Sequence, residues 1–426
     1  MQQRPIQCYA GAIAGILAAL AIVGGLWVAA YRAPEGGRTL NETASLTAGS
    51  DSGSERHWMI TPVQVSDDHT VPASGSGQSG FFVGNCAVPI EHLYQLPAAR
   101  DEVQALYADA VHSVGAEEAQ WLSDDDLVVG VRLYGHARCY PHNILARHSL
   151  VNDQLGGQPI LVYYDPPSAT YMAFERPVRA DETLDFGSSG IGYGGAGLAY
   201  DRQTESLWTA IGGPALDMGQ PLSGPAREEQ LGLAPVAVEA MTWAAWRKLW
   251  PDTTVMSPQT GHDFDYSFDP YTRVLGPDGQ ALDYYYGGLL LAPEWMSDAT
   301  GTLPDKTDVL GVLLPDGPLA IPVQPVLSAV ADGHETFTRD SPLGQLQLVA
   351  DGPTRSIHVT TPGNVRPPQL RQMWFAWRWC HPETELWQPV EVVGGGSTTD
   401  ASLSGADASD ATADVTSDAT SDDITD

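Results

Sequence analysis

Basic side chains are scarce in this chain of 426 residues. Lys and Arg number 21 against 53 Asp and Glu, which gives a formal net charge of -32. Proteins bind nucleic acids largely by neutralising phosphates with Lys and Arg, so this composition argues against DNA or RNA as a partner. We interpret the acidity as a solubilising surface in a solvent-facing location. A dedicated cation-binding surface is the alternative.

The chain also lacks the short signatures of two common hydrolase classes. It contains no GxSxG, the nucleophile elbow of many serine hydrolases, and no HExxH, the zinc-binding helix of many metalloproteases. Gly190, Gly192 and Gly195 do match GxGxxG. A nucleotide-binding turn must lead into a helix, however, and the AGLAYDR that follows does not predict one. We therefore expect this glycine cluster to be a loop between strands.

Cysteine is rare as well, with four residues in the whole chain. Cys8 lies beside an apolar N-terminal segment, whereas Cys86, Cys139 and Cys380 belong to the remainder and form no close CxxC pair. One disulfide with a free thiol fits this pattern. Three buried thiols fit it equally well, because free cysteine packs as a small hydrophobe.

An uncharged apolar segment stands near the N-terminus. Residues 10–30 would form ~30 Å of helix, the thickness of a bilayer core. We predict a membrane anchor; a signal cleaved after Val28-Ala29-Ala30 is the alternative. Flanking arginines leave the orientation open, but an N-terminal apolar segment before a chain nearly free of lysine favours export. The expected product is a single-pass protein of the cell membrane whose large domain faces the periplasm or the exterior.

Composition divides the chain into four segments. Residues 33–80 are rich in Gly, Ser, Thr and Asp without an apolar period, which predicts a flexible stalk. Residues 394–426 contain eight Asp, no basic residue and no aromatic residue, which predicts a disordered acidic tail. The expected organisation is an anchor or signal at 1–32, then the stalk, a globular domain at 81–393 and the tail.

Short apolar runs dominate the globular segment. Runs bounded by Gly, Pro and Asp predict strands at 127–134, 160–164, 171–174 and 345–350. Apolar residues near the helical period predict helices at 240–250 and 370–379. The predicted fold class is therefore α+β, predominantly β: a single sheet-rich domain with a few short packed helices.

An internal similarity supports the β-rich prediction. Residues 126–145 align without gaps on residues 307–326, which places Gly130 on Gly311 and Pro141 on Pro322. Each segment predicts a strand, a turn, a second strand and a helical turn that begins after proline. We expect a duplicated unit, with both copies in one domain because no linker separates them.

Residues 200–208 (YDRQTESLW) combine two carboxylates, a guanidinium, two hydroxyls and an indole. Such a concentration of hydrogen-bonding groups makes Asp201, Arg202 and Glu205 candidate ligand-binding residues. The alternative is a structural one, in which carboxylates hold the arginine on a hairpin.

A second group of functional side chains stands between residues 139 and 165. These side chains could bind zinc or iron, or supply an acid and a base, but none has diagnostic metal spacing. A histidine beside a turn is also commonly a hydrogen-bonded structural residue. The members of this group are Cys139, His142, His148, Asn152, Asp153 and Asp165.

Several of these motifs, in this order, resemble the domain of unknown function 3179 family, whose members look like exported or anchored proteins without a settled activity. The resemblance spans residues 116–388. It rests on Asp124 to Leu145, His148 to Asp153, Tyr164 to Phe174, Tyr200 to Trp208, Thr242 to Pro251 and Trp374 to Leu386.

Two departures from the family pattern bear on chemistry. Ser149 stands where the family has Glu, and residues 165–168 (DPPS) stand where it has CPLC. If the family's cysteines perform redox chemistry or hold a soft metal, this chain has lost that capacity, since serine is a poor ligand and cannot form a disulfide. Asp165 could still hold a hard cation through oxygen.

Two functional hypotheses follow. The first is a membrane-tethered extracytoplasmic module that binds a small ligand, a polymer or a protein through His148, Asn152, Asp153, Asp201, Arg202 and Glu205. The second is a metal-dependent hydrolase or oxidoreductase that binds a divalent metal through His142, His148, Asp153 and Asp165. The lost thiol pair favours the first hypothesis.

Overall fold

The computed structural model describes residues 60–72, 80–108, 111–275, 281–298, 300–363 and 365–390. The chain divides into two compact units, Met1–Val390 and Glu391–Asp426, and every described residue belongs to the first. The expected anchor, the acidic tail and most of the expected stalk lie outside the described residues. Within the described residues, no helix is both long enough and apolar enough to span a bilayer.

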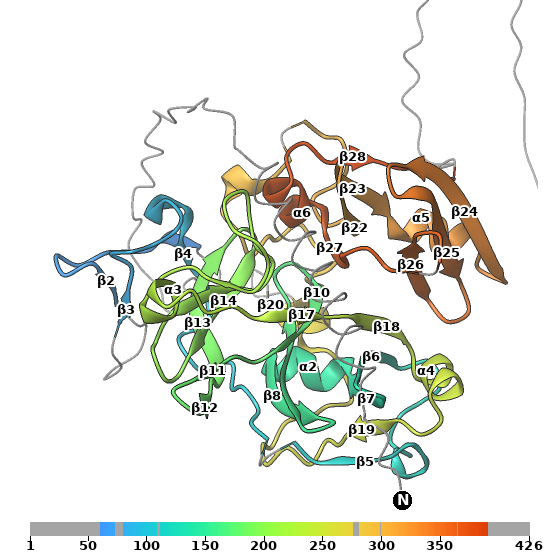
Figure 1. Ribbon diagram of the computed structural model, residues 1–426, viewed down its shortest axis with the longest axis horizontal. Coiled ribbons are helices and arrows are strands. Elements are labelled where there is room, and N and C mark those ends of the chain that lie inside the picture. The colour runs from blue at the N-terminus through green and yellow to red at the C-terminus, as the bar shows by residue number, and fades with distance from the viewer. Residues whose placement is uncertain are drawn as a thin grey trace, which may run out of the picture. The chain divides into compact units, whose positions relative to one another are not determined.

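The described part is predominantly β, as the sequence predicts (Figure 1). Five sheets have three or more strands each, in an arrangement like a five-bladed propeller. Its α-helices are short. They are α2 (His142–His148), α3 (Pro225–Glu228), α4 (Trp243–Leu249), α5 (Val323–Ala329) and α6 (Trp374–Cys380).

The predicted duplication is present in the fold. In the first copy, β6 (Leu127–Leu133) pairs with β7 (His136–Pro141), which leads into α2. In the second copy, β22 (Asp308–Leu314) pairs with β23 (Gly317–Pro322), which leads into α5. The element boundaries correspond residue for residue with the ungapped sequence alignment.

Each copy then continues beyond the segment that the sequence comparison matched. The helix is followed by a three-stranded antiparallel meander, then a strand, a helix and a short strand parallel to the second strand of the copy. In the first copy these strands are β8 (Leu150–Leu155), β9 (Gln158–Asp165), β10 (Thr170–Glu175), β18 (Val238–Thr242) and β19 (Thr254–Met256). In the second they are β24 (His334–Ser341), β25 (Gly344–Asp351), β26 (Ser356–Thr360), β27 (Gln369–Met373) and β28 (Glu385–Leu386).

A buried tryptophan on a glycine fixes the same packing in both copies. A Cβ atom on Gly130 would lie 2.0 Å from the ring of Trp246, and one on Gly311 would lie 2.2 Å from the ring of Trp377. Only glycine lets each helix lie this close to its sheet. The indole of Trp246 donates to the Thr253 hydroxyl at 2.9 Å, and that of Trp377 makes the equivalent bond at 2.9 Å.

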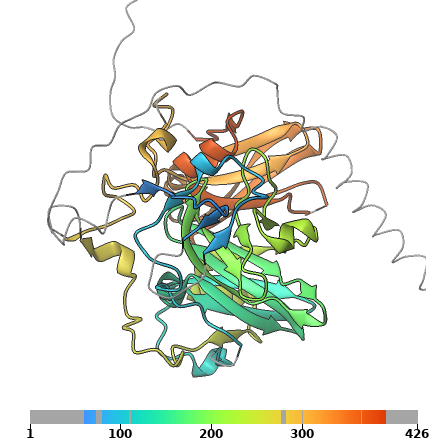
Figure 2. The same ribbon diagram turned by 90° about the vertical axis from the view of Figure 1, so that its left-hand side faces the viewer.

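The two copies contact each other reciprocally. The amide of Met373, at the end of β27, donates to the carbonyl of Ser168 in the first copy's β9–β10 turn at 2.9 Å. The amide of Thr242, at the end of β18, donates to the carbonyl of Thr354 in the equivalent turn of the second copy at 3.1 Å. The green first copy and the orange second copy are therefore packed side by side in Figure 2.

A sheet built largely from an insertion interrupts the first copy between β10 and β18: β13 to β16 belong to the insertion, and β1 and β4 precede the first copy. Its strand order is β1-β4-β13-β14-β15-β16, and β17 (Ala234–Val236) then pairs with β10. The strands are β1 (Thr61–Pro62), β4 (Tyr94–Gln95), β13 (Phe186–Tyr193), β14 (Ala196–Asp201), β15 (Leu207–Thr209) and β16 (Gln220–Pro221).

Short strands complete the described fold. They are β2 (Thr70–Val71) with β3 (Phe81–Phe82), β5 (Ser113–Gly115) beside β19, β11 (Val178–Arg179) with β12 (Glu182–Thr183), and β20 (Val274–Leu275) with β21 (Ala281–Leu282). Two short strands, β1 and β2, fall inside the expected stalk, so residues 61–62 and 70–71 are paired with other strands.

Two further expectations need correction. Gly190 and Gly192 lie within strand β13 and not in a loop, because β13 pairs with β14 on both sides of a bulge. The helices expected at 240–250 and 370–379 begin later, at Trp243 and Trp374. The residues before them form β18 and β27, which complete ladders with β6 and β22.

Candidate functional site

A chain of three polar side chains lies at the start of α2. His142 is the first residue of this helix, directly after Pro141 at the end of β7. Its Nε2 atom is 2.7 Å from Oδ2 of Asp269, and its Nδ1 atom is 2.7 Å from the hydroxyl of Tyr171 on β10. We call these residues the Tyr171–His142–Asp269 triad.

Two more tyrosines extend the triad. The hydroxyl of Tyr285 donates to Oδ2 of Asp269 at 2.7 Å and lies 2.6 Å from the hydroxyl of Tyr164. The ring of Tyr164 stacks on that of Tyr171 with centroids 4.7 Å apart. Five side chains from β9, β10, α2 and two following loops thus form one connected polar cluster.

The charges of the triad follow from its hydrogen bonds. Burial alone would raise the pKa of Asp269, but hydrogen bonds from His142, Tyr285 and the amide of Tyr271 outweigh it and hold that pKa below its usual value. Burial raises the pKa of Tyr171, so its phenol stays protonated. An ionised Asp269 accepts the proton of His142 Nε2, and Nδ1 of the same ring lies against the hydroxyl of Tyr171.

The second copy of the repeat has no counterpart of this cluster. Strand and helix registers place Val323 at the position of His142, Ala350 at that of Tyr164 and Ile357 at that of Tyr171. The same local fold therefore forms with aliphatic residues at all three positions. This comparison indicates that the polar side chains of the first copy do not serve the fold.

Asp165 lies in the neighbouring β9–β10 turn. Its carboxylate accepts hydrogen bonds from the amides of Gly197 at 2.7 Å and Ser168 at 2.9 Å, and from the hydroxyls of Ser168 and Tyr163. Burial raises the pKa of Asp165 to about 6 against these hydrogen bonds. The Asp351 carboxylate accepts from the amide of Thr354 in the equivalent turn at 2.9 Å, so the DPPS segment preserves a turn shared by both copies.

The other candidates of the first group have separate partners. His148 is buried and bonds the carbonyl of Gln104 and the hydroxyl of Tyr266. Asn152 is buried and bonds both the amide and the carbonyl of Phe186. Asp153 accepts from Arg138 at 2.6 Å and from Tyr140 at 2.7 Å. Among the described residues, no group of three or more His, Cys, Asp or Glu could hold a metal ion.

The 200–208 segment forms the end of β14, a turn and the start of β15. Asp201 is fully buried and accepts from the Thr204 amide at 2.6 Å and from the Trp208 indole at 2.9 Å. Arg202 donates to the carboxylate of Asp101, at 2.8 and 3.0 Å, and Glu205 accepts from Arg100. A carboxylate does hold Arg202 on a hairpin, as the structural alternative expects. That carboxylate is the one of Asp101, in a distant loop, and not the one of Asp201.

All three cysteines of the described part are free thiols. Cys139 and Cys380 are buried, and Cys86 is partly buried. Burial raises the pKa of each thiol, which keeps them protonated and unreactive.

Sequence reasoning missed most of the triad. His142 stood among the metal candidates, but Tyr171, Tyr285 and Asp269 were not singled out. Asp269 lies 127 positions from His142, and no spacing rule joins them. Aligning the two copies beyond residue 326 places Tyr164 on Ala350 and Tyr171 on Ile357. That change from aliphatic to polar residues is the sequence signal for the cluster.

Comparison with protein-family models supports the resemblance that the sequence motifs indicate. A family model described as "Protein of unknown function (DUF3179)" matches residues 100–341, more than half of the chain. The search of curated proteins and the search of solved structures gave no match. The matched region contains β6 to β24 and every member of the triad. The chain therefore belongs to the domain of unknown function 3179 family.

Proposed function

We propose that this protein is a membrane-anchored extracytoplasmic module that binds a small ligand with hydrogen-bonding groups at the Tyr171–His142–Asp269 triad. One observation carries the proposal: His142, Tyr164 and Tyr171 occupy positions that the second copy fills with Val323, Ala350 and Ile357. Buried polar groups cost folding free energy unless they are fully paired. Their presence in only one copy of a shared fold therefore points to a role other than stability.

The triad is suited to exchange a hydrogen bond with a ligand. The side chain of His142 is 13% exposed and that of Asp269 is 7% exposed, while Tyr171 and Tyr285 are half-buried. A ligand hydroxyl or N–H at this edge meets phenol oxygens that can accept a hydrogen bond, on a framework held by an ionised carboxylate.

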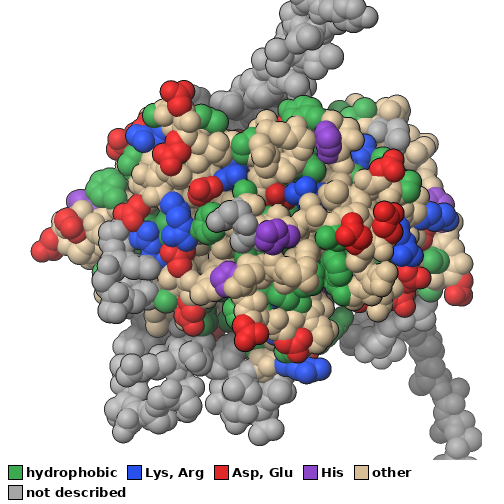
Figure 3. Space-filling model, turned by 90° about the horizontal axis from the view of Figure 1, so that it is seen from below, with side chains coloured by type: hydrophobic (Ala, Val, Ile, Leu, Met, Phe, Trp, Pro, Cys, Tyr) green, Lys and Arg blue, Asp and Glu red, His purple; other side chains and the backbone are tan. Residues whose placement is uncertain are grey.

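The placement outside the membrane is supported by sequence alone. The apolar segment at 10–30 and the near absence of lysine favour export. On the face drawn in Figure 3, Lys and Arg side chains are interspersed with Asp and Glu, which favours a small-molecule or protein partner over nucleic acid.

Substitutions copied from the second repeat test the binding proposal. His142→Val and Tyr171→Ile place in the first copy the residues that the second copy already accommodates. Thermal-shift screening of the wild type against a library of polar small molecules should find ligands that raise the melting temperature. That increase should disappear in both variants and persist in Ile357→Val, the control in the second copy. Ligands that stabilise the variants and the wild type equally would contradict the proposal.

An acid–base enzyme is a second candidate. The geometry that favours it is a histidine placed between a phenol and an ionised carboxylate, the arrangement of a base and the group that orients it. The metal-dependent hydrolase or oxidoreductase that the sequence suggests would need His142, His148, Asp153 and Asp165 around one ion, whereas each of these side chains has its own separate partners. Elemental analysis of gently purified protein tests that version, and a preparation with no stoichiometric metal would contradict it.

A further inference from the structure

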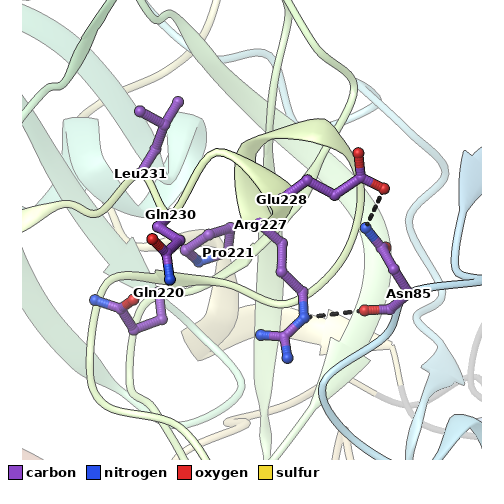
Figure 4. Close-up of a pocket in the computed structure, with 7 residues that line it drawn as sticks. All are labelled: Asn85, Gln220, Pro221, Arg227, Glu228, Gln230 and Leu231. Atoms are coloured by element: carbon purple, nitrogen blue, oxygen red, sulfur yellow. Dashed lines mark hydrogen bonds between the residues drawn. The ribbon is translucent and has the colours of Figure 1, made fainter.

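A pocket of about 360 Å³ lies in the inserted sheet, away from the triad (Figure 4). It is bounded by the end of β16, helix α3 and the loop that contains Asn85. Its volume falls in the range of small-molecule sites. The residues around it are Asn85, Gln220, Pro221, Arg227, Glu228, Gln230 and Leu231.

Asn85 fixes the position of Arg227 in this pocket. The Asn85 carbonyl accepts from Nε of Arg227 at 3.0 Å. The Asn85 side chain is itself held by Gly224, whose amide donates to it at 2.8 Å and whose carbonyl accepts from it at 3.0 Å. Within the described part of the chain, the two terminal guanidinium nitrogens of Arg227 have no hydrogen bond or ion pair.

Two glutamine amides accompany the guanidinium. The side chains of Gln220 and Gln230 border the pocket, and neither makes a hydrogen bond to another described residue. The acidic residue of the pocket, Glu228, accepts from Asn85 at 3.1 Å, and Figure 4 shows its carboxylate turned toward Asn85 and away from the glutamines. The pocket thus presents one positioned cation and two unpaired amides.

We propose that this pocket binds a small monocarboxylate with an apolar body. The planar fork of a guanidinium matches the two oxygens of a carboxylate, and glutamine amides supply further donors. A doubly charged phosphate or sulfate is disfavoured, because Glu228 lies beside Arg227 and the chain carries a net charge of -32. The walls at Pro221 and Leu231 receive the apolar part.

Apart from Asn85, the pocket belongs to the insertion and not to the repeat. Gln220, Arg227 and Gln230 stand between β10 and β17, and the second copy passes from β26 to β27 without an equivalent sheet. Binding here is therefore independent of the triad and of the function proposed for it.

Benzoate is a suitable probe, because it joins a carboxylate to an apolar ring. Its dissociation constant for the purified full chain can be measured by ligand-observed NMR titration. Arg227→Gln and Gln220→Leu should each weaken binding, the first at least tenfold. Arg247→Gln is the matched control, because it removes the same charge from an exposed arginine paired with Asp124. That control should leave the dissociation constant unchanged.

Neutral and doubly charged probes complete the experiment. Benzamide and sulfate should bind at least tenfold more weakly than benzoate. The proposal is overturned if folded wild-type protein does not bind benzoate, or if benzamide or sulfate binds as tightly. Equal affinity of the wild type and of both pocket variants, each shown to be folded by circular dichroism, would overturn it as well.

Discussion

The imidazole of His142 has a different partner on each nitrogen, and this pairing fixes the orientation of the ring. Nε2 meets the ionised carboxylate of Asp269 and Nδ1 meets the protonated phenol of Tyr171. Together the two partners hold the imidazole in one orientation. The aliphatic Val323 at the equivalent position of the second copy has no hydrogen-bonding group to offer.

The sequence identified some of these residues but could not join them. His142 and Asp165 stood out as ligand-type side chains near a turn. Their partners depend on tertiary structure: Tyr171 arrives through the β9–β10 hairpin, and Asp269 through a loop far along the chain. Hydrogen bonds between such distant segments leave no spacing in the sequence.

Asp165 gives a prediction about pH. Its folded-state pKa is about 6, above the usual value near 3.9 of an unfolded chain. The folded state therefore binds more protons between these values, and the contribution of Asp165 to stability falls as pH rises from about 4 to about 6. The loss is on the order of 3 kcal/mol.

Chemical unfolding of the wild type and of Asp165→Asn at several pH values checks this expectation. The difference in unfolding free energy between them should change in favour of the variant as pH rises through that window. Asp351→Asn, in the equivalent but more exposed turn, is the control for other carboxylates. A difference that stays constant from pH 4 to pH 7 would show that Asp165 has an ordinary pKa in the folded protein.

Among the structural elements, the helices show how the repeat is built. The two helices predicted from the sequence exist, but both begin later than predicted, at Trp243 and Trp374. The apolar residues around Ala240 and Leu370 suit a helix as well as a strand. Pairing with β6 and β22 decides the outcome. A local apolar period cannot report the presence of such a neighbouring strand.

The glycine beneath each helix yields the second prediction. Gly130→Ala and Gly311→Ala would place a methyl group inside the ring of Trp246 or Trp377, and the helix must then move away from its sheet. Overpacking of this kind costs about 1–3 kcal/mol. Urea denaturation should show that loss for each variant. Gly288→Ala, which meets nothing within 4 Å, should unfold like the wild type, and equal stability of all three would contradict the packing argument.

At the scale of the whole molecule, two copies of one β-rich unit share a fold but differ in their polar side chains and in their insertions. The reciprocal hydrogen bonds of Met373 and Thr242 join them into one body, as the absence of a linker composition indicates. Among the described residues, the triad is formed by the first copy and the segment that follows it, and only the first copy is interrupted by the insertion that holds most of the Arg227 pocket. The sequence comparison detected the repeat over 20 residues only. The insertion between β10 and β18 separates the remaining elements of the first copy, so they no longer align with those of the second.

The central claim is that the polar side chains of the first copy serve ligand binding and that the fold does not require them. The most direct test is the unfolding free energy of the double variant His142→Val, Tyr171→Ile, measured by chemical denaturation. We expect a cooperative transition and a loss of no more than about 3 kcal/mol, the cost of leaving Asp269 with fewer hydrogen bonds. A larger loss, or a chain that no longer unfolds cooperatively, would show that the triad is part of the scaffold.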